Sequence, residues 1–185
     1  MTDKAQPDRT SRVPKYEFAD DLETQQAQLA ANPMLQRFLE SRRAFASDPY
    51  RPIYHYVSPE STMNDPNGLC FWQGRWHLFY QGYPPEDPRQ HWGHAVSRDL
   101  IHWRDLPYAI YPNPERCCFS GATYVEDDRV IAMYHGTEAG NMIAISEDPL
   151  LLNWKKLTGQ PVIPIASPDG TPLPYRVFDP CIWKK

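Results

Sequence analysis

The sequence lacks a long apolar run, an excess of basic residues and a regular cysteine spacing. Residues 1–16 are polar and charged, with no apolar stretch behind a basic start. Neither a secretory signal nor a membrane span is therefore predicted, and the expected location is cytoplasmic. The 19 Lys and Arg residues are outnumbered by 23 Asp and Glu residues, which argues against a nucleic-acid backbone or an anionic membrane as partner. A neutral small molecule fits this charge balance better.

The four cysteines do not form a Cys-x-x-Cys pair. Two of them are adjacent, which is an awkward geometry for a structural disulfide, so free and buried thiols are expected. The cysteines are Cys70, Cys117, Cys118 and Cys181. Zinc ligation together with His91, His94 or His135 is disfavoured because the spacings do not match those of zinc sites. No metal and no cofactor is expected.

Length and composition bound the organisation of the chain. A sequence of 185 residues that is 41% hydrophobic and 13% aromatic suits one domain with a sizeable core. Twenty prolines against nine glycines indicate many stiff connections. We expect residues 1–17 to be disordered or extended, residues 18–50 to form a helical extension and residues 51–185 to form the main domain.

Residues 18–45 carry a helical pattern. Asp20 and Asp21 precede a run rich in Gln and Ala, and Asn32 can cap a second helix that has Pro33 at its first position. An apolar stripe at helical spacing consists of Leu35, Phe38, Leu39 and Phe45. We expect this stripe to lie across the outside of the main domain, with a partner-binding helix as the alternative.

After residue 52 the pattern changes to short strands that repeat about fifty residues apart. A strand, a strand ending in Ser, an acidic turn and a Trp occur over residues 76–103 and again over residues 131–154. Such a period, with about four strands in each unit, is typical of propeller blades around a central channel. Asp65, Ser120 and Asp179 stand at equivalent strand starts. Asp65 and Asp179 should therefore face one another across the channel, with Ser120 between them.

The strongest candidate for chemistry is Asp65, in the run Asn64-Asp65-Pro66-Asn67-Gly68. A carboxylate held rigidly beside a proline at the mouth of a strand suits a nucleophile. The same five residues also suit a turn that opens a hairpin. Only the surrounding sequence favours the first interpretation over the second.

Four blocks of the sequence occur together in one order. They are residues 54–82, then Trp92-Gly93-His94-Ala95-Val96-Ser97 with Asp99-Leu100-Ile101-His102-Trp103, then Phe119-Ser120-Gly121-Ala122, then Phe178-Asp179-Pro180. This order resembles glycoside hydrolase family 32, the β-fructosidases that include invertases, levanases, inulinases and sucrose-6-phosphate hydrolases. The resemblance extends from about residue 51 to residue 185.

The resemblance implies an all-β fold, a five-bladed β-propeller followed by a β-sandwich, of which two blades and the first strand of a third are expected here. It implies cleavage of terminal β-fructofuranosyl linkages in a fructose-containing sugar, with retention through a covalent fructosyl-enzyme. In this pattern Asp65 matches the nucleophile and Asp179 the transition-state stabiliser. The substrate-binding positions are matched by Asn64, Gln81, Trp92 at the rim, Phe119 and Ser120.

Three residues depart from the family pattern. Thr62 replaces a Trp, Gly82 an Asn, and Phe178 the Arg that precedes the stabilising Asp. Arg176 lies on the same side of an extended strand as Phe178 and is a candidate to replace that Arg. The Glu-Cys motif that carries the acid/base is absent. We therefore expect the 185 residues alone to be inactive and the rest of the propeller, with the sandwich, to lie in a further part of the protein.

Two alternatives stay open at this point. A five-bladed relative of the family 43 kind would cleave arabinan or xylan with inversion, and a truncated or degenerate module would bind sugar without catalysis. The complete Asn-Asp-Pro-Asn-Gly run and the Phe-Ser-Gly block favour family 32 over the family 43 kind.

Overall fold

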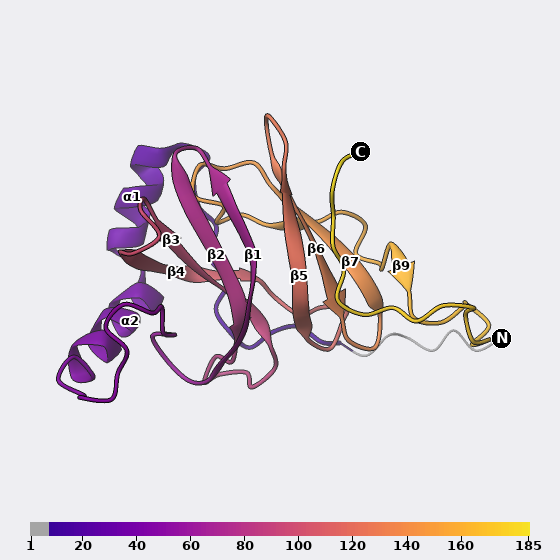
Figure 1. Cartoon of the computed structure of the whole chain (residues 1–185), viewed down its shortest axis with the longest axis horizontal. Helices are drawn as coiled ribbons and strands as arrows, with labels where there is room; N and C mark the ends of the chain where they lie inside the picture. The colour runs from indigo at the N-terminus through magenta and orange to yellow at the C-terminus, as the bar shows by residue number, and fades with distance from the viewer. Residues whose placement is uncertain (1–7) are drawn as a thin grey trace.

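The computed structural model of the protein describes residues 8–185 and shows two antiparallel sheets side by side, with two helices against the first (Figure 1). The first sheet has the order β1-β2-β3-β4; its strands are β1 (Met63–Trp72), β2 (Arg75–Gly82), β3 (His91–Ser97) and β4 (Trp103–Ile110). The second has the order β5-β6-β7-β8; its strands are β5 (Cys118–Val125), β6 (Val130–Gly136), β7 (Gly140–Ser146) and β8 (Lys155–Lys156), and β9 (Ile163–Pro164) also pairs with β7. Each sheet is a meander in which sequential strands are neighbours, as in a propeller blade.

The two sheets repeat each other at the level of single contacts. The indole Nε1 of Trp103 donates to the carbonyl oxygen of Leu100 at 3.1 Å, and that of Trp154 donates to the carbonyl oxygen of Leu151 at 2.8 Å. Both leucines have a positive φ, 65° and 52°. The predicted repeat is confirmed, and each tryptophan locks the turn that leads into the fourth strand of its sheet.

The main core lies between the sheets, where Phe79, Trp92 and Tyr134 are fully buried. Gly68 allows β1 to come this close to β5, because a Cβ at this position would lie 3.1 Å from Phe79, Trp92 and Thr123, and its φ is +57°. The hydroxyl of Thr123 donates to the carbonyl oxygen of Gly68 at 2.9 Å. The inner strands of the two blades are thereby fixed against each other.

The helical extension forms as its capping residues indicate. The side chain of Asp21 accepts an N–H of the first turn of α1 (Leu22–Ala30). Asn32 accepts two N–H groups at the start of α2 (Pro33–Ala44), whose first residue is Pro33. Both predicted helix starts are confirmed.

The apolar stripe of α2 is narrower than predicted. Met34 and Phe38 are buried, and Phe38 contacts the ring of Tyr108 in β4 edge-on. Leu39 and Phe45, which the sequence placed in the stripe, are 47% and 51% exposed. Leu39 follows Phe38 by one residue and so points about 100° around the helix from it; Phe45 is the C-cap residue, beyond the last turn. As expected, α2 packs on the outer strand of the first sheet, but only the N-terminal half of the helix makes this apolar contact.

Three histidines lie in the core of the first sheet without an exposed surface. Burial lowers the pKa of His77 and of His91 to about 4, and it lowers the pKa of His94 well below its usual value. His77 Nδ1 lies 3.0 Å from His94 Nε2, so protonation of both rings would place two charges side by side in the core. All three rings are neutral in the folded protein at neutral pH.

Lowering the pH from about 7.5 to about 5.5 is expected to reduce the free energy of unfolding by about 4 kcal/mol, about 1.4 kcal/mol for each buried histidine. In the unfolded chain these rings take up protons near pH 6.5, while the folded state holds them neutral, so acid favours unfolding. Urea unfolding across this pH range measures the change. The exposed His55 supplies the control, since His55→Gln should leave the pH dependence unaltered; a flat profile would contradict the burial argument.

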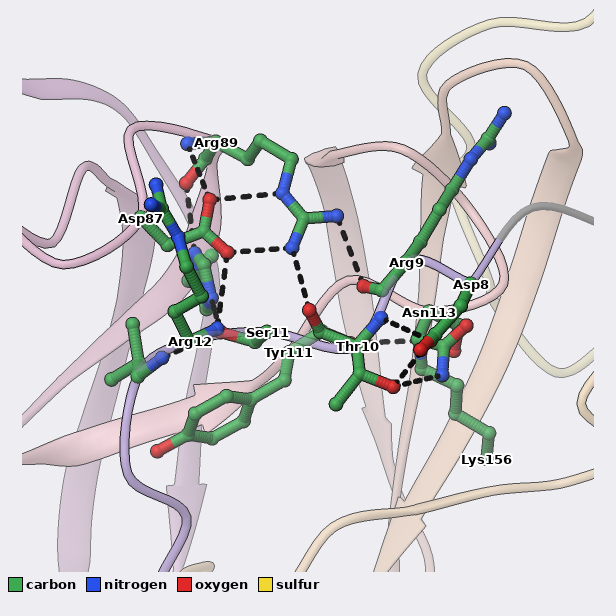
Figure 2. A network of polar contacts seen from close by, with 12 residues as sticks. Asp8, Arg9, Thr10, Ser11, Arg12, Asp87, Arg89, Tyr111, Asn113 and Lys156 are labelled. Atoms are coloured by element: carbon green, nitrogen blue, oxygen red, sulfur yellow. Dashed lines mark hydrogen bonds and ion pairs between the residues drawn. The ribbon is translucent and has the colours of Figure 1, made fainter.

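Residues 8–16, the N-terminal arm, run in extended form along one end of both sheets (Figure 1). The guanidinium of Arg89 donates to the carbonyl oxygens of Arg9 and Thr10 at 3.0 and 3.3 Å, as Figure 2 shows. Burial raises the pKa of Asp87, but the hydrogen bonds from Arg89 outweigh it and hold this pKa well below the usual range. The arm also pairs Arg9 with Glu138 of the second sheet at 2.6 Å. The arm therefore contacts both sheets and holds them together. Residues 1–7 of the predicted N-terminal segment lie outside the described residues.

The predicted first strand of a third blade is not formed. Residues 165–185 contain no strand. A strand needs a hydrogen-bonding neighbour, and beyond Ile165, whose N–H donates to the carbonyl oxygen of Ala139, no backbone hydrogen bond joins this segment to another described residue. Cys70 and Cys118 are buried as expected, whereas Cys117 is half-buried and Cys181 exposed. No disulfide joins cysteines in the described part of the chain.

Candidate active site

Three strands bring their polar side chains together at one end of the two sheets. Ser120 Oγ, on β5, donates to Asp65 Oδ2, on β1, at 2.9 Å. Gln81 Nε2, at the end of β2, donates to Ser120 Oγ at 2.8 Å and to Asp65 Oδ2 at 3.3 Å. Of the residues matched to family positions, Asp65, Gln81 and Ser120 thus form one cluster.

The carboxylate of Asp65 is accessible and, among the described residues, has only neutral partners. Its partners are a neutral hydroxyl and a neutral amide, and within residues 8–185 no Lys or Arg forms an ion pair with it. Asp65 is exposed, whereas Gln81 is 4% exposed and therefore rigidly placed. Only Oδ2 accepts hydrogen bonds from described side chains, so Oδ1 has no hydrogen-bond partner among residues 8–185.

A β-bulge at the start of β1 sets the direction of the side chains of Asn64 and Asp65. Met63 pairs with Gly82 and Pro66 with Tyr80, so two residues of β1 stand opposite the single residue Gln81. Consecutive side chains of a regular strand point to opposite faces, and a bulge re-aims one of them. Pro66 has no N–H to donate to β2 at this position, which suits an interrupted ladder.

Tyr83 and Gln90 are site residues that the sequence analysis missed. Asn64 Nδ2 donates to the hydroxyl oxygen of Tyr83 at 2.8 Å, and Gln90 Nε2 donates to the same oxygen at 2.9 Å. Tyr83 follows Gln81 by two residues and so falls on the same side of the extended chain. That alternation is the signal in the sequence that could have identified it.

Trp92 does not lie at the rim, which corrects the prediction. Its ring has no exposed surface and packs between Phe79 and Tyr134, with centroid distances of 5.4 and 5.6 Å. Its indole Nε1 donates to the carbonyl oxygen of Phe119 at 2.8 Å. The reason is the course of β3, a strand whose residues are all buried because it runs through the middle of its sheet. Trp92 therefore supports the site indirectly, because its hydrogen bond to Phe119 fixes the backbone next to Ser120.

An aromatic group lies beside the cluster. The ring of Phe119, which is half-buried, lies 6.1 Å from that of His135 and 6.4 Å from that of Phe178. His135 and Phe178 are 4.8 Å apart. Phe178, which is 61% exposed, anchors the C-terminal segment, drawn in yellow in Figure 1, alongside β6. His135 was not among the predicted site residues.

The structure brings Asp179 to the second sheet but not into the hydrogen-bonded cluster. Asp179 follows Phe178 directly and is exposed, and so is Arg176. Among residues 8–185 neither side chain makes a hydrogen bond or an ion pair. That Asp179 faces Asp65, and that Arg176 reaches toward the sugar, stay predictions.

The described residues show neither a metal-ligand cluster nor a membrane-spanning helix. Within residues 8–185 no three His, Cys, Asp or Glu side chains are grouped as metal ligands would be. Neither of the two helices described has the length and apolar character needed to span a bilayer.

Comparison with known proteins places this geometry in a family. Residues 55–185 match the model of the glycosyl hydrolases family 32 N-terminal domain. The chain is 37% identical over 137 residues to a levanase of Bacillus subtilis, covering 65% of this chain and 20% of that protein. It is 39% identical over 131 residues to a fructan 6-exohydrolase of Beta vulgaris, covering 63% of this chain and 22% of that protein. The chain thus spans about a fifth of the length of these relatives.

Solved structures agree with the sequence relatives. A family 32 beta-fructofuranosidase of Bombyx mori superposes with a TM-score of 0.64 at 36% identity, over 84% of this chain and 34% of that one. A variant of the same enzyme in complex with sucrose gives a TM-score of 0.63 at 35% identity. These likenesses confirm the predicted propeller class and do not favour the family 43 alternative. The chain belongs to glycosyl hydrolase family 32.

Proposed function

We propose that the protein hydrolyses terminal β-fructofuranosyl linkages of sucrose or a fructan, with retention of configuration. In this mechanism Asp65 attacks the anomeric carbon while the glycosidic C–O bond breaks and a second carboxylic acid gives its proton to the leaving oxygen. Water then hydrolyses the covalent fructosyl-enzyme, giving its proton to that second carboxylate and releasing Asp65. Asp179 stabilises the oxocarbenium-like transition state. The second carboxylate that retention requires, roughly 5 Å from the first, belongs to a part of the propeller beyond the described cluster.

One observation carries the proposal, namely the asymmetric binding of the Asp65 carboxylate. Ser120 and Gln81 hold Oδ2 from two other strands, while Oδ1 has no hydrogen-bond partner among residues 8–185. A nucleophile needs one oxygen free to attack and a fixed orientation for the attack. A carboxylate that served only to cap a turn would accept backbone N–H groups from its own loop, and the hydrogen bonds of Asp65 do not have that pattern.

The surrounding side chains suit a sugar. Asn64, Gln81 and Ser120 offer amides and a hydroxyl to sugar hydroxyl groups, and Phe119 offers an aromatic face to the apolar side of a ring. The relatives described above include a levanase, a fructan 6-exohydrolase and a beta-fructofuranosidase whose variant binds sucrose. These names support sucrose or fructan as the substrate class. The rest of the propeller and a β-sandwich complete the protein in this proposal.

The proposal is tested on the protein in its complete natural form. Incubation with sucrose and with levan should release fructose, and added methanol should trap the fructosyl unit as the β-methyl fructoside, because a retaining enzyme transfers to the same face. Nuclear magnetic resonance of the product distinguishes the two anomers. Formation of the α-methyl fructoside would contradict retention, and the absence of released fructose would contradict the hydrolase assignment.

A further inference from the structure

The β-bulge at the start of β1 turns two consecutive side chains toward the end of β2. Asp65 contacts Gln81, and its neighbour Asn64 contacts Tyr83, two residues further along the same side of the chain. Without the extra residue between Met63 and Pro66, the side chains of Asn64 and Asp65 would point to opposite faces of the sheet. The bulge therefore makes Asn64 and Tyr83 part of the same surface as the Asp65 carboxylate.

The hydroxyl of Tyr83 acts as an acceptor toward both of its partners. Asn64 Nδ2 and Gln90 Nε2 are amide nitrogens, which only donate, and both point at the Tyr83 oxygen, at 2.8 and 2.9 Å. The phenolic proton is therefore left for a third partner, and no acceptor for it occurs among residues 8–185. Tyr83 is half-buried, so part of its surface is accessible to a ligand.

Within residues 8–185, Asn64 has a free hydrogen-bond acceptor, whereas Tyr83 has a free donor. Its amide nitrogen is bound to Tyr83, while its carbonyl oxygen Oδ1 accepts nothing from the described residues, and Asn64 is exposed. A free O–H donor on Tyr83 thus lies next to a free acceptor on Asn64. A sugar hydroxyl, which donates one hydrogen bond and accepts others, matches this pair.

We propose that Tyr83 is a specificity-determining residue whose hydroxyl donates a hydrogen bond to one ring hydroxyl of the fructosyl unit held against Asp65, while Asn64 Oδ1 accepts from that same hydroxyl. This inference rests on the proposed function and adds a named contact to it. Gln90 is the positioning residue of the arrangement, because it fills the second acceptor site of Tyr83 and so directs the phenolic proton toward the sugar.

The test is Tyr83→Phe in the complete natural protein, which removes one hydroxyl and leaves the ring. We expect kcat/KM on sucrose to fall about tenfold to thirtyfold, the value of one hydrogen bond to a substrate hydroxyl. The thermal midpoint should stay within about 2 °C of wild type, since the hydroxyl contributes little to packing. Tyr50→Phe is the matched control, because Tyr50 is 92% exposed and its side chain makes no hydrogen bond with residues 8–185.

A series of sucrose analogues, each lacking one hydroxyl of the fructosyl ring, distinguishes direct contact of Tyr83 with the sugar from a structural role of Tyr83 in the site. If Tyr83 touches the sugar, Tyr83→Phe loses nothing further on the one analogue that lacks the partner hydroxyl and keeps its loss on the others. An equal loss on every analogue, or unchanged kcat/KM on sucrose, overturns the inference while the proposed function stands. A wild-type protein that releases no fructose overturns both.

Discussion

Asp65→Asn is expected to reduce kcat on sucrose by about three orders of magnitude or more, with the fold unchanged. The amide keeps the shape of the carboxylate and its contacts with Ser120 and Gln81 but cannot form the fructosyl-enzyme bond. The rate is measured as fructose released by the complete natural protein, and the fold by near-ultraviolet circular dichroism.

A matched control for this variant is Asp127→Asn in the hairpin between β5 and β6. Asp127 is exposed and its side chain makes no hydrogen bond with a described residue, so the same chemical change should leave kcat unaltered. Retention of more than about a tenth of the wild-type rate by Asp65→Asn would show that Asp65 is not the nucleophile.

Lys156→Met is expected to lower the free energy of unfolding by about 3–5 kcal/mol. Lys156 Nζ donates to the carbonyl oxygens of Tyr111 and Asn113 at 2.8 and 2.6 Å and forms an ion pair with Glu115. Glu115 has no exposed surface, so loss of the ammonium group leaves a buried charge without a counter-ion. Thermal and urea unfolding measure the effect.

Two further variants test whether the loss of stability comes from the buried ion pair. Lys155→Met changes the exposed neighbour on the same short strand and should cost less than about 0.5 kcal/mol. Glu115→Gln added to Lys156→Met should recover part of the loss, because the amide carries no charge to leave unpaired. If Lys155→Met and Lys156→Met destabilise equally, the buried ion pair is not the cause.

The features that the sequence predicted well are those with local causes. A helix start depends on a capping side chain and its immediate neighbours, so Asp21 and Asn32 could be identified directly. The blade repeat placed Asp65 and Ser120 at equivalent strand starts; each is the third residue of its strand, β1 or β5, and their side chains lie 2.9 Å apart.

The features that the sequence did not predict depend on residues far apart in the chain. Trp92 sits at the start of a strand, where an aromatic residue suits a rim and a core equally well, and only the packing of Phe79 and Tyr134 decides for the core. Glu115 and Lys156 are 41 positions apart and belong to no motif, so nothing local indicates their ion pair. Asp179 was expected in a strand, but a strand start is defined by a pairing neighbour, and the described residues provide none.

The N-terminal arm has a consequence for the order in which the protein folds during synthesis. Arg9 leaves the ribosome early, yet its partner Glu138 follows 129 residues later, so their ion pair closes only after β6 has been made. Arg89, which holds the backbone of the arm, follows Arg9 by 80 residues. The arm is translated before both sheets and yet completes its contacts only after the first sheet and β6 of the second have been made, so a chaperone that holds the arm acts on a chain whose two sheets can already have paired.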